Sequence, residues 1–202
     1  MTMSISAVIL AGGQAKRMEG ADKGLQLLHG KPLFQFIYDR LRLQVEQISI
    51  NANRNQAIYA TAGVPVFGDN LEGFQGPLSG ILTALERADS DFVLFVPCDS
   101  PFFPDKLLEK LKSAVDFHGV SIAYVHDGER EHPTFCLMAR SLKDKLATYL
   151  ASGERRMLRF MRQNGAVSVD FSENKQAFTN INTLADLTYF NQQKDFSGFI
   201  AK

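Results

Sequence analysis

A glycine-rich segment near the N-terminus has the residue types that bind phosphate. The run Leu10-Ala11-Gly12-Gly13 follows a predicted strand, and the cations Lys16, Arg17 and Lys23 come next along the chain. Adjacent glycines let the backbone turn and approach a ligand closely, while cations can hold phosphate oxygens. The segment therefore predicts a phosphate-binding loop, although it is neither a Walker A loop nor a GxGxxG fingerprint. The alternative interpretation is a surface turn that ends in a solvated basic patch.

A lone carboxylate follows a second, strongly apolar run. Asp99 comes shortly after the run from Phe92 to Val96, where a parallel sheet would place its ligand-binding edge. Mg²⁺ bound to a substrate's phosphates keeps several waters and takes only one or two protein carboxylates. Asp99 is therefore the candidate metal ligand. On this segment alone, an Asp that forms a turn before Pro101 is an equal alternative.

Other polar side chains also follow predicted strands. Asn51 and Asp69 stand where a base or ribose could be bound, but each could instead be a helix cap or an Asx turn. Asn182, which precedes a predicted helix, could complete a metal or phosphate site. His126 and His132 flank a polar stretch that favours a turn between strands, because it lacks the spacing of a metal site or of a catalytic triad.

The order of apolar runs and helical segments predicts an α/β fold. Alternation of this kind is what a parallel sheet with crossover helices requires. The expected strands are Ile5 to Ala11, Gln47 to Asn51, Pro65 to Phe67, Phe92 to Val96, Val120 to Val125, Thr134 to Met138 and Ala166 to Val169. The expected helices begin near Pro32, Pro77, Pro104 and Thr183.

The alternation breaks between Val120 and Val169, so an antiparallel edge or flap is expected there, beside the site. No repeat or linker divides the chain. We therefore expect one domain over residues 1–193 and a C-terminal tail over residues 194–202, frayed from Lys194 onward.

Composition narrows the class of protein. Of the 202 residues, 45% are hydrophobic and 22% are charged, which indicates a globular chain. Lys plus Arg and Asp plus Glu number 22 each, so no overall charge favours nucleic acid. No apolar run is long enough to span a membrane. Cys98 and Cys136 form no metal-binding or disulfide pattern, which favours a reducing compartment and a cytoplasmic location.

Taken together, these motifs resemble the molybdenum cofactor guanylyltransferases over about residues 5 to 193. The matching segments, in family order, are Leu10-Ala11-Gly12-Gly13, Arg17-Met18, Asp22-Lys23-Gly24, Gly30-Lys31-Pro32-Leu33, Asn51-Ala52-Asn53-Arg54, Gly76-Pro77-Leu78-Ser79-Gly80, Pro97-Cys98-Asp99, His126-Asp127-Gly128-Glu129-Arg130, Gly153-Glu154-Arg155-Arg156 and Asn180-Ile181-Asn182-Thr183. The glycine-rich opening alone would indicate only a nucleotidyltransferase.

The resemblance implies a Rossmann-like nucleotidyltransferase fold, with a mostly parallel central sheet, helices on both faces and a small antiparallel edge. It also implies that GTP and Mg²⁺ bind at the sheet edge. The terminal phosphate of molybdopterin would then attack the α-phosphorus, with release of pyrophosphate. Because that phosphate is already an anion, no Ser, Cys or His nucleophile is needed.

Site residues also follow from the resemblance. The implied GTP contacts are Leu10, Ala11, Gly12, Gly13, Lys23, Asn51, Asp69 and Asp99, with Asp99 also on the metal. Lys23 and Arg17 would stabilise the charge that builds up towards pyrophosphate. Asp69 is the candidate for reading guanine, with the ribose as its alternative ligand. The candidate pterin contacts are Arg155, Arg156, Asn180 and Asn182.

Two other functions remain open at this point. A related nucleotidyltransferase could use CTP or a sugar 1-phosphate, because a shared fold does not fix the substrate. A GTP-binding protein without turnover could deliver the cofactor to apoenzymes. For the guanylyltransferase we expect a monomer that binds neither nucleic acid nor membrane and makes transient contacts with molybdenum-insertion enzymes and apo-molybdoenzymes.

Overall fold

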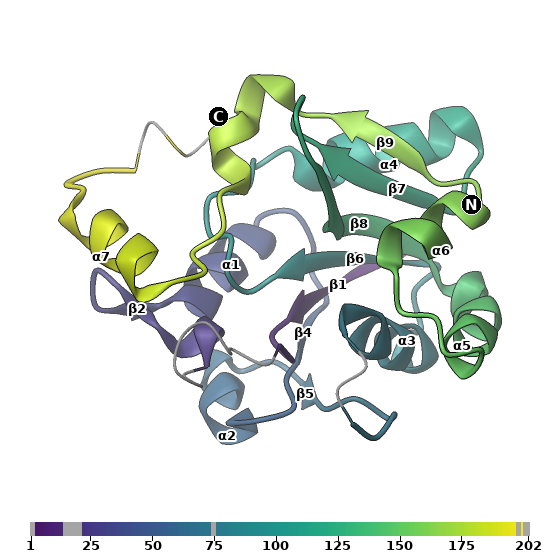
Figure 1. Ribbon diagram of the computed structural model, residues 1–202, viewed down its shortest axis with the longest axis horizontal. Coiled ribbons are helices and arrows are strands. Elements are labelled where there is room, and N and C mark those ends of the chain that lie inside the picture. The colour runs from purple at the N-terminus through teal and green to yellow at the C-terminus, as the bar shows by residue number, and fades with distance from the viewer. Residues whose placement is uncertain (1–2, 14–21, 74–75, 197–198, 200–202) are drawn as a thin grey trace.

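A seven-stranded sheet runs through the computed structural model, which describes residues 3–13, 22–73, 76–196 and 199 (Figure 1). From one edge to the other its strands are β5 (Val66–Phe67), β4 (Ile48–Asn51), β1 (Ile5–Leu10), β6 (Phe92–Pro97), β8 (Glu131–Ala139), β7 (Ile122–His126) and β9 (Val167–Asp170). All seven strands expected from the sequence are present, with bounds that shift by one to three residues. The predicted α/β class is therefore confirmed.

The strand directions show why the alternation breaks after β6. Strands β5, β4, β1 and β6 pair in parallel, whereas β8 is antiparallel to both β6 and β7. The antiparallel strand β8 therefore lies inside the sheet. The outermost strand on this side is β9, which is parallel to β7, whereas an antiparallel edge was expected. A tight turn after β7 reverses the chain, and the returning strand β8 pairs with β6 on one side and with β7 on the other.

Helices cover both faces of the sheet. They are α1 (Leu33–Leu41), α2 (Gln56–Tyr59), α3 (Pro77–Arg87), α4 (Leu107–His118), α5 (Lys143–Ala151), α6 (Met157–Gln163) and α7 (Leu184–Gln192). Apolar residues of α1 and α4 pack in one core cluster, and those of α3, α5 and α6 pack in the other. No described helix is long and apolar enough to cross a membrane.

The central strands are apolar on both sides because each side meets a core. In β1, Ala7 and Ile9 belong to the cluster under α1 and α4, while Val8 belongs to the opposite cluster. In β6, Leu94 and Val93 divide in the same way. Successive strand residues point to opposite faces, so an unbroken apolar run is what a strand covered on both sides requires.

Two of the predicted helix starts are confirmed in detail. Pro77 occupies the first turn of α3, and Thr183 caps α7 in a reciprocal capping box with Asp186. Pro32 stands immediately before α1 and ends a short strand, while α4 begins three residues after Pro104.

A small hairpin beside α7 was not predicted. It joins β2 (Leu27–Leu28) to β3 (Lys31–Pro32), and Figure 1 shows it next to α7. The amide of Asn191 in α7 accepts a bond from the His29 N–H at 2.7 Å and donates one to the Leu27 carbonyl at 3.1 Å. The contact attaches the last helix to a segment near the start of the chain.

The described part of the C-terminal tail packs on this region. The rings of Phe196 and Phe199 lie 5.0 Å and 5.6 Å from that of Phe102, which is buried. The frayed tail expected from Lys194 is therefore wrong for these two residues. The division into a domain of residues 1–193 and a tail of residues 194–202 stays a prediction.

Candidate active site

The glycine loop lies at the carboxyl edge of the sheet. The Ala11 N–H donates to the Asn51 carbonyl at 2.8 Å, and the Cys98 N–H donates to the Leu10 carbonyl at 3.1 Å, so β4 and β6 flank the loop. A Cβ on Gly12 would come within 3.1 Å of the Asn51 side chain. Gly13 has open space around it. The predicted catalytic residue Arg17, and Lys16 with it, lie outside the described residues.

A charged cluster forms where β6 ends. The Lys23 ammonium donates to Asp99 Oδ2 at 3.1 Å and to Asn182 Oδ1 at 2.6 Å. The side chains of Lys23 and Asp99 are 25% and 13% exposed, so solvent screens the ion pair only in part. Three residues far apart in the sequence thus meet at the edge where ligands bind in open α/β sheets.

The segment that carries Asn180 and Asn182 is held against the end of β6. The Ile181 N–H donates to the Asp99 carbonyl at 2.7 Å. The Ser100 hydroxyl lies 2.7 Å from Asn180 Oδ1 and 3.3 Å from Asp99 Oδ1. Both asparagines therefore lie beside Asp99, as their place before the last helix allowed.

The position of Lys23 depends on contacts that the sequence did not reveal. Lys23 opens a 3-10 turn (Lys23–Leu25), and the Asp22 carboxylate before it accepts bonds from the Tyr59 hydroxyl at 2.5 Å and the Asn55 amide at 3.1 Å. Burial raises the pKa of Tyr59, so its hydroxyl remains a donor. A Cβ on Gly24 would come within 2.4 Å of this hydroxyl, so the turn requires glycine there.

Asn51 and Asp69 form a second polar unit next to the glycine loop. The Asn51 amide donates to Asp69 Oδ1 at 2.8 Å, and the Asn53 side chain accepts from the Asp69 N–H at 2.8 Å. Asn51 is only 2% exposed. A Cβ on Gly80 in α3 would lie 2.2 Å from Asn51 Oδ1, so the helix can pack here only with glycine. Asp69 Oδ2 has no described partner.

The cysteines do not take part in this site as nucleophiles. Both are free and buried, and burial raises the pKa of the Cys98 and Cys136 thiols. A thiol held in its neutral form is a poor nucleophile. The described residues also contain no group of three or more His, Cys, Asp or Glu side chains that could hold a metal ion.

A polar cavity of about 520 Å³ adjoins the Lys23 cluster. Its lining includes Asn180 and Asn182 from one side and Asp127, Arg130 and His132 from the turn between β7 and β8. The predicted pterin contacts Arg155 and Arg156 are not among its lining residues. The Arg155 guanidinium donates to the carbonyls of Leu150 and Glu154, near its own position in the chain.

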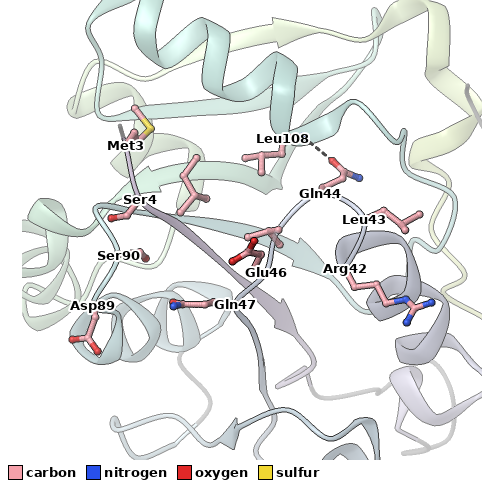
Figure 2. A pocket seen from close by; sticks show the side chains of 12 residues that line it. Met3, Ser4, Arg42, Leu43, Gln44, Glu46, Gln47, Asp89, Ser90 and Leu108 are labelled. Carbon is pink, nitrogen blue, oxygen red and sulfur yellow. Dashed lines mark hydrogen bonds between the residues drawn. The ribbon is translucent and has the colours of Figure 1, made fainter. Parts of the chain in front are cut away.

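A larger cavity of about 740 Å³ lies at the amino ends of the parallel strands, opposite the carboxyl edge. Figure 2 shows its lining, which includes Ser4 before β1, Gln47 before β4 and Asp89 before β6. Of the predicted site residues that the structure describes, none lines this cavity. Cavity size therefore does not identify the site, whereas the convergence of polar side chains at the carboxyl edge does.

Comparison with known proteins gives one consistent result. A family model described as a MobA-like NTP transferase domain matches residues 7–167. A molybdenum cofactor guanylyltransferase from Mannheimia succiniciproducens is 69% identical, over 93% of this chain and 98% of its own length. The corresponding protein from Yersinia pestis is 45% identical, over 96% of this chain and 98% of its own length.

Solved structures share the fold. The molybdopterin-guanine dinucleotide biosynthesis protein A from Archaeoglobus fulgidus has a TM-score of 0.77 at 22% identity, covering 93% of this chain and 97% of its own. A 4-diphosphocytidyl-2C-methyl-D-erythritol synthase from Anaerococcus prevotii has a TM-score of 0.71 at 14% identity, covering 94% and 95%. At such low identity these similarities show the fold and not the substrate.

Proposed function

The chain belongs to the molybdenum cofactor guanylyltransferases, and we propose that it transfers GMP from GTP to the terminal phosphate of molybdopterin. The product is molybdopterin guanine dinucleotide, with pyrophosphate as the leaving group. One observation of the structure supports this most strongly. The Lys23 ammonium joins Asp99, beside the glycine loop, to Asn182, which lines the neighbouring polar cavity. Two substrate sites that share one charged cluster are what a transfer between two phosphates requires.

The residues suit direct transfer without a covalent intermediate. An oxygen of the acceptor phosphate attacks the α-phosphorus of GTP, and the bond from that phosphorus to the pyrophosphate oxygen breaks. The attacking group is an anion at neutral pH, so the protein needs only to orient it and stabilise the growing charge. Lys23 supplies a positive charge for the triphosphate, and we assign Arg17 the same role.

The oxygens around Asp99 also suit a metal ion. Two oxygens, Asp99 Oδ2 and Asn182 Oδ1, converge on the Lys23 ammonium, so a cation is already stabilised at this place. Mg²⁺ bound with GTP would neutralise phosphate charge there. The Asp99 carboxylate would hold this ion, and the Lys23 ammonium would bind phosphate oxygens beside it.

We propose that Asp69 recognises guanine. Guanine presents two adjacent N–H donors, whereas adenine would present a lone pair to a carboxylate. Asn51 orients Asp69 through Oδ1 and leaves Oδ2 available. We therefore assign base reading to Asp69, with the backbone of Leu10 to Gly13 beside it. Binding of the ribose hydroxyls is the alternative role.

The pterin substrate is assigned to the 520 Å³ cavity. Asn180 and Asn182 line it, and both are fixed by contacts around Asp99. These asparagines are favoured over Arg155 and Arg156, which do not line the cavity.

We also propose a cellular location, an oligomeric state and partner proteins for the enzyme. Two free, buried cysteines suit a reducing compartment, so we place the protein in the cytoplasm. We propose that it acts as a monomer and makes transient contacts with molybdenum-insertion enzymes and apo-molybdoenzymes. A balanced charge of 22 cationic and 22 anionic side chains gives it no general attraction to nucleic acid.

A nucleotide panel tests the function. The wild-type protein is incubated with Mg²⁺, molybdopterin and each of GTP, ATP, CTP and UTP, and pyrophosphate and the dinucleotide product are measured. We expect product with GTP only, and pyrophosphate release only when molybdopterin is present. Equal turnover with CTP would favour a related nucleotidyltransferase. GTP binding without turnover would favour a cofactor-delivery protein.

A further inference from the structure

The turn between β7 and β8 is held by hydrogen bonds to a buried carboxylate, that of Asp127. Asp127 is 5% exposed, and its Oδ1 accepts bonds from the N–H groups of Glu129 at 2.9 Å and Arg130 at 2.7 Å. The Asp127 N–H donates to the Arg130 carbonyl at 3.0 Å. Gly128 has a φ of +92°, which few other residues tolerate. The backbone of Arg130 is thus fixed through both its N–H and its carbonyl.

A histidine secures the other oxygen of the same carboxylate. His132 Nε2 lies 2.7 Å from Asp127 Oδ2, and its ring stacks on that of Phe178 at 5.4 Å. Burial of Asp127 would raise its pKa, but hydrogen bonds from His132 and from the backbone of Arg130 and Glu129 outweigh burial and lower the pKa to about 2. The carboxylate is therefore charged at neutral pH and holds the turn.

The charged and titratable side chains that line the cavity have described partners, with one exception. Asp127 pairs with His132, Glu129 pairs with Lys175, and Glu131 pairs with Arg162. Among the described lining residues, Arg130 is the cation whose charged group, the guanidinium, has no hydrogen bond or ion pair in the structure. Its side chain is exposed and borders the cavity that also contains Asn182, the partner of Lys23.

We propose that Arg130 binds the phosphate of molybdopterin and brings it to the α-phosphorus of GTP, with Asp127 and His132 as positioning residues. This assignment rests on the proposed function. A guanidinium can donate two parallel hydrogen bonds to a phosphate, which fixes direction as well as place. The acceptor needs such a partner because a phosphate dianion must approach the anionic triphosphate of GTP.

Equilibrium binding to Arg130→Ala tests the assignment. Calorimetry with wild type and variant would use three ligands, namely molybdopterin, its dephosphorylated form and GTP. We expect the variant to lose roughly ten- to hundredfold in affinity for molybdopterin, the usual effect of removing a charged hydrogen bond. Affinities for the dephosphorylated pterin and for GTP should stay within a factor of two. Arg130→Lys, which keeps the charge but not the paired donors, should fall in between.

Arg42→Ala is the matched control, because Arg42 is 61% exposed and lines the cavity at the opposite sheet edge. It should leave all three affinities unchanged. Asp127→Asn should weaken molybdopterin binding in the wild-type background and have no further effect in the Arg130→Ala background, because it acts through Arg130. A purely structural role for Asp127 would weaken binding in both backgrounds.

Three results would overturn the assignment. Unchanged molybdopterin affinity in Arg130→Ala would show that Arg130 is only a surface residue. Equal losses for the phosphorylated and dephosphorylated pterins would place Arg130 on the ring system, and a loss confined to GTP would place it on the nucleotide. Wild-type protein that binds no molybdopterin would instead contradict the proposed function itself, and this assignment with it.

Discussion

Gly80 offers a sharp test of how the nucleotide side of the site is built. In Gly80→Ala the added methyl group would lie 2.2 Å from Asn51 Oδ1 and 2.9 Å from its Cγ. Asn51 is 2% exposed and has no room to withdraw without rotating its amide. That rotation would break the 2.8 Å hydrogen bond from Asn51 to Asp69.

Two opposing effects set the magnitude. Loss of a hydrogen bond to a charged group costs about 1.5 to 3 kcal/mol, whereas alanine stabilises a helix interior by about 0.8 to 1 kcal/mol relative to glycine. Gly80→Ala should therefore lower the free energy of unfolding by about 0.5 to 2 kcal/mol. GTP affinity should fall as well, because Asp69 is no longer oriented.

Urea unfolding in two backgrounds measures the clash directly. In Asn51→Ala the obstructing amide is absent, so adding Gly80→Ala should raise the free energy of unfolding by up to about 1 kcal/mol. The same substitution thus destabilises one background and stabilises the other. An equal effect in both backgrounds would show that Asn51 does not limit the packing of α3.

Three further predictions concern individual side chains. Lys23→Ala should reduce both GTP affinity and turnover by roughly ten- to more than a hundredfold, and values within a factor of two of wild type would leave Lys23 as a solvated surface cation. Asp69→Ala should lower the preference for GTP over ITP and ATP, and a variant slowed equally with all three nucleotides would assign Asp69 to the ribose or the loop. Asp127 has a folded pKa of about 2 against an ordinary value of 3.8, so its contribution to stability is fully present above about pH 4 and is lost as the pH falls towards 2. Between pH 5 and pH 3, the free energy of unfolding in urea should fall less for Asp127→Asn than for wild type. Equal falls would contradict the low pKa.

The sequence predicted those parts of the fold that depend on local patterns. The buried strand β6 is an unbroken apolar run, and β1 is apolar apart from Ser6. Helix α3 begins at a proline and α7 at a capping threonine. The hairpin of β2 and β3 was missed because strands of two residues are too short to show a period. The place of β8 inside the sheet was also missed, since strand order depends on contacts distant in sequence.

The site was predictable where side chains follow strand ends. Asn51, Asp69 and Asp99 lie at the carboxyl edge because parallel strands end there together. The hydrogen bond from Tyr59 to Asp22 was not predictable, because Tyr59 lies in a short helix with no distinctive pattern. The pairing of Asp127 with His132 was equally hidden, since a polar turn does not reveal which of its side chains are buried.

The metal dependence of Asp99→Asn tests the central claim most directly. The amide keeps the shape of the side chain but loses the charge that would hold Mg²⁺ beside the triphosphate. GMP transfer to molybdopterin would be measured for wild type and variant over a range of Mg²⁺ concentrations, with circular dichroism as the check on folding. We expect a folded variant whose turnover is lower by about a hundredfold or more. Near-normal turnover of the variant at limiting Mg²⁺ would contradict the account, because Asp99 would then have no part in binding the metal.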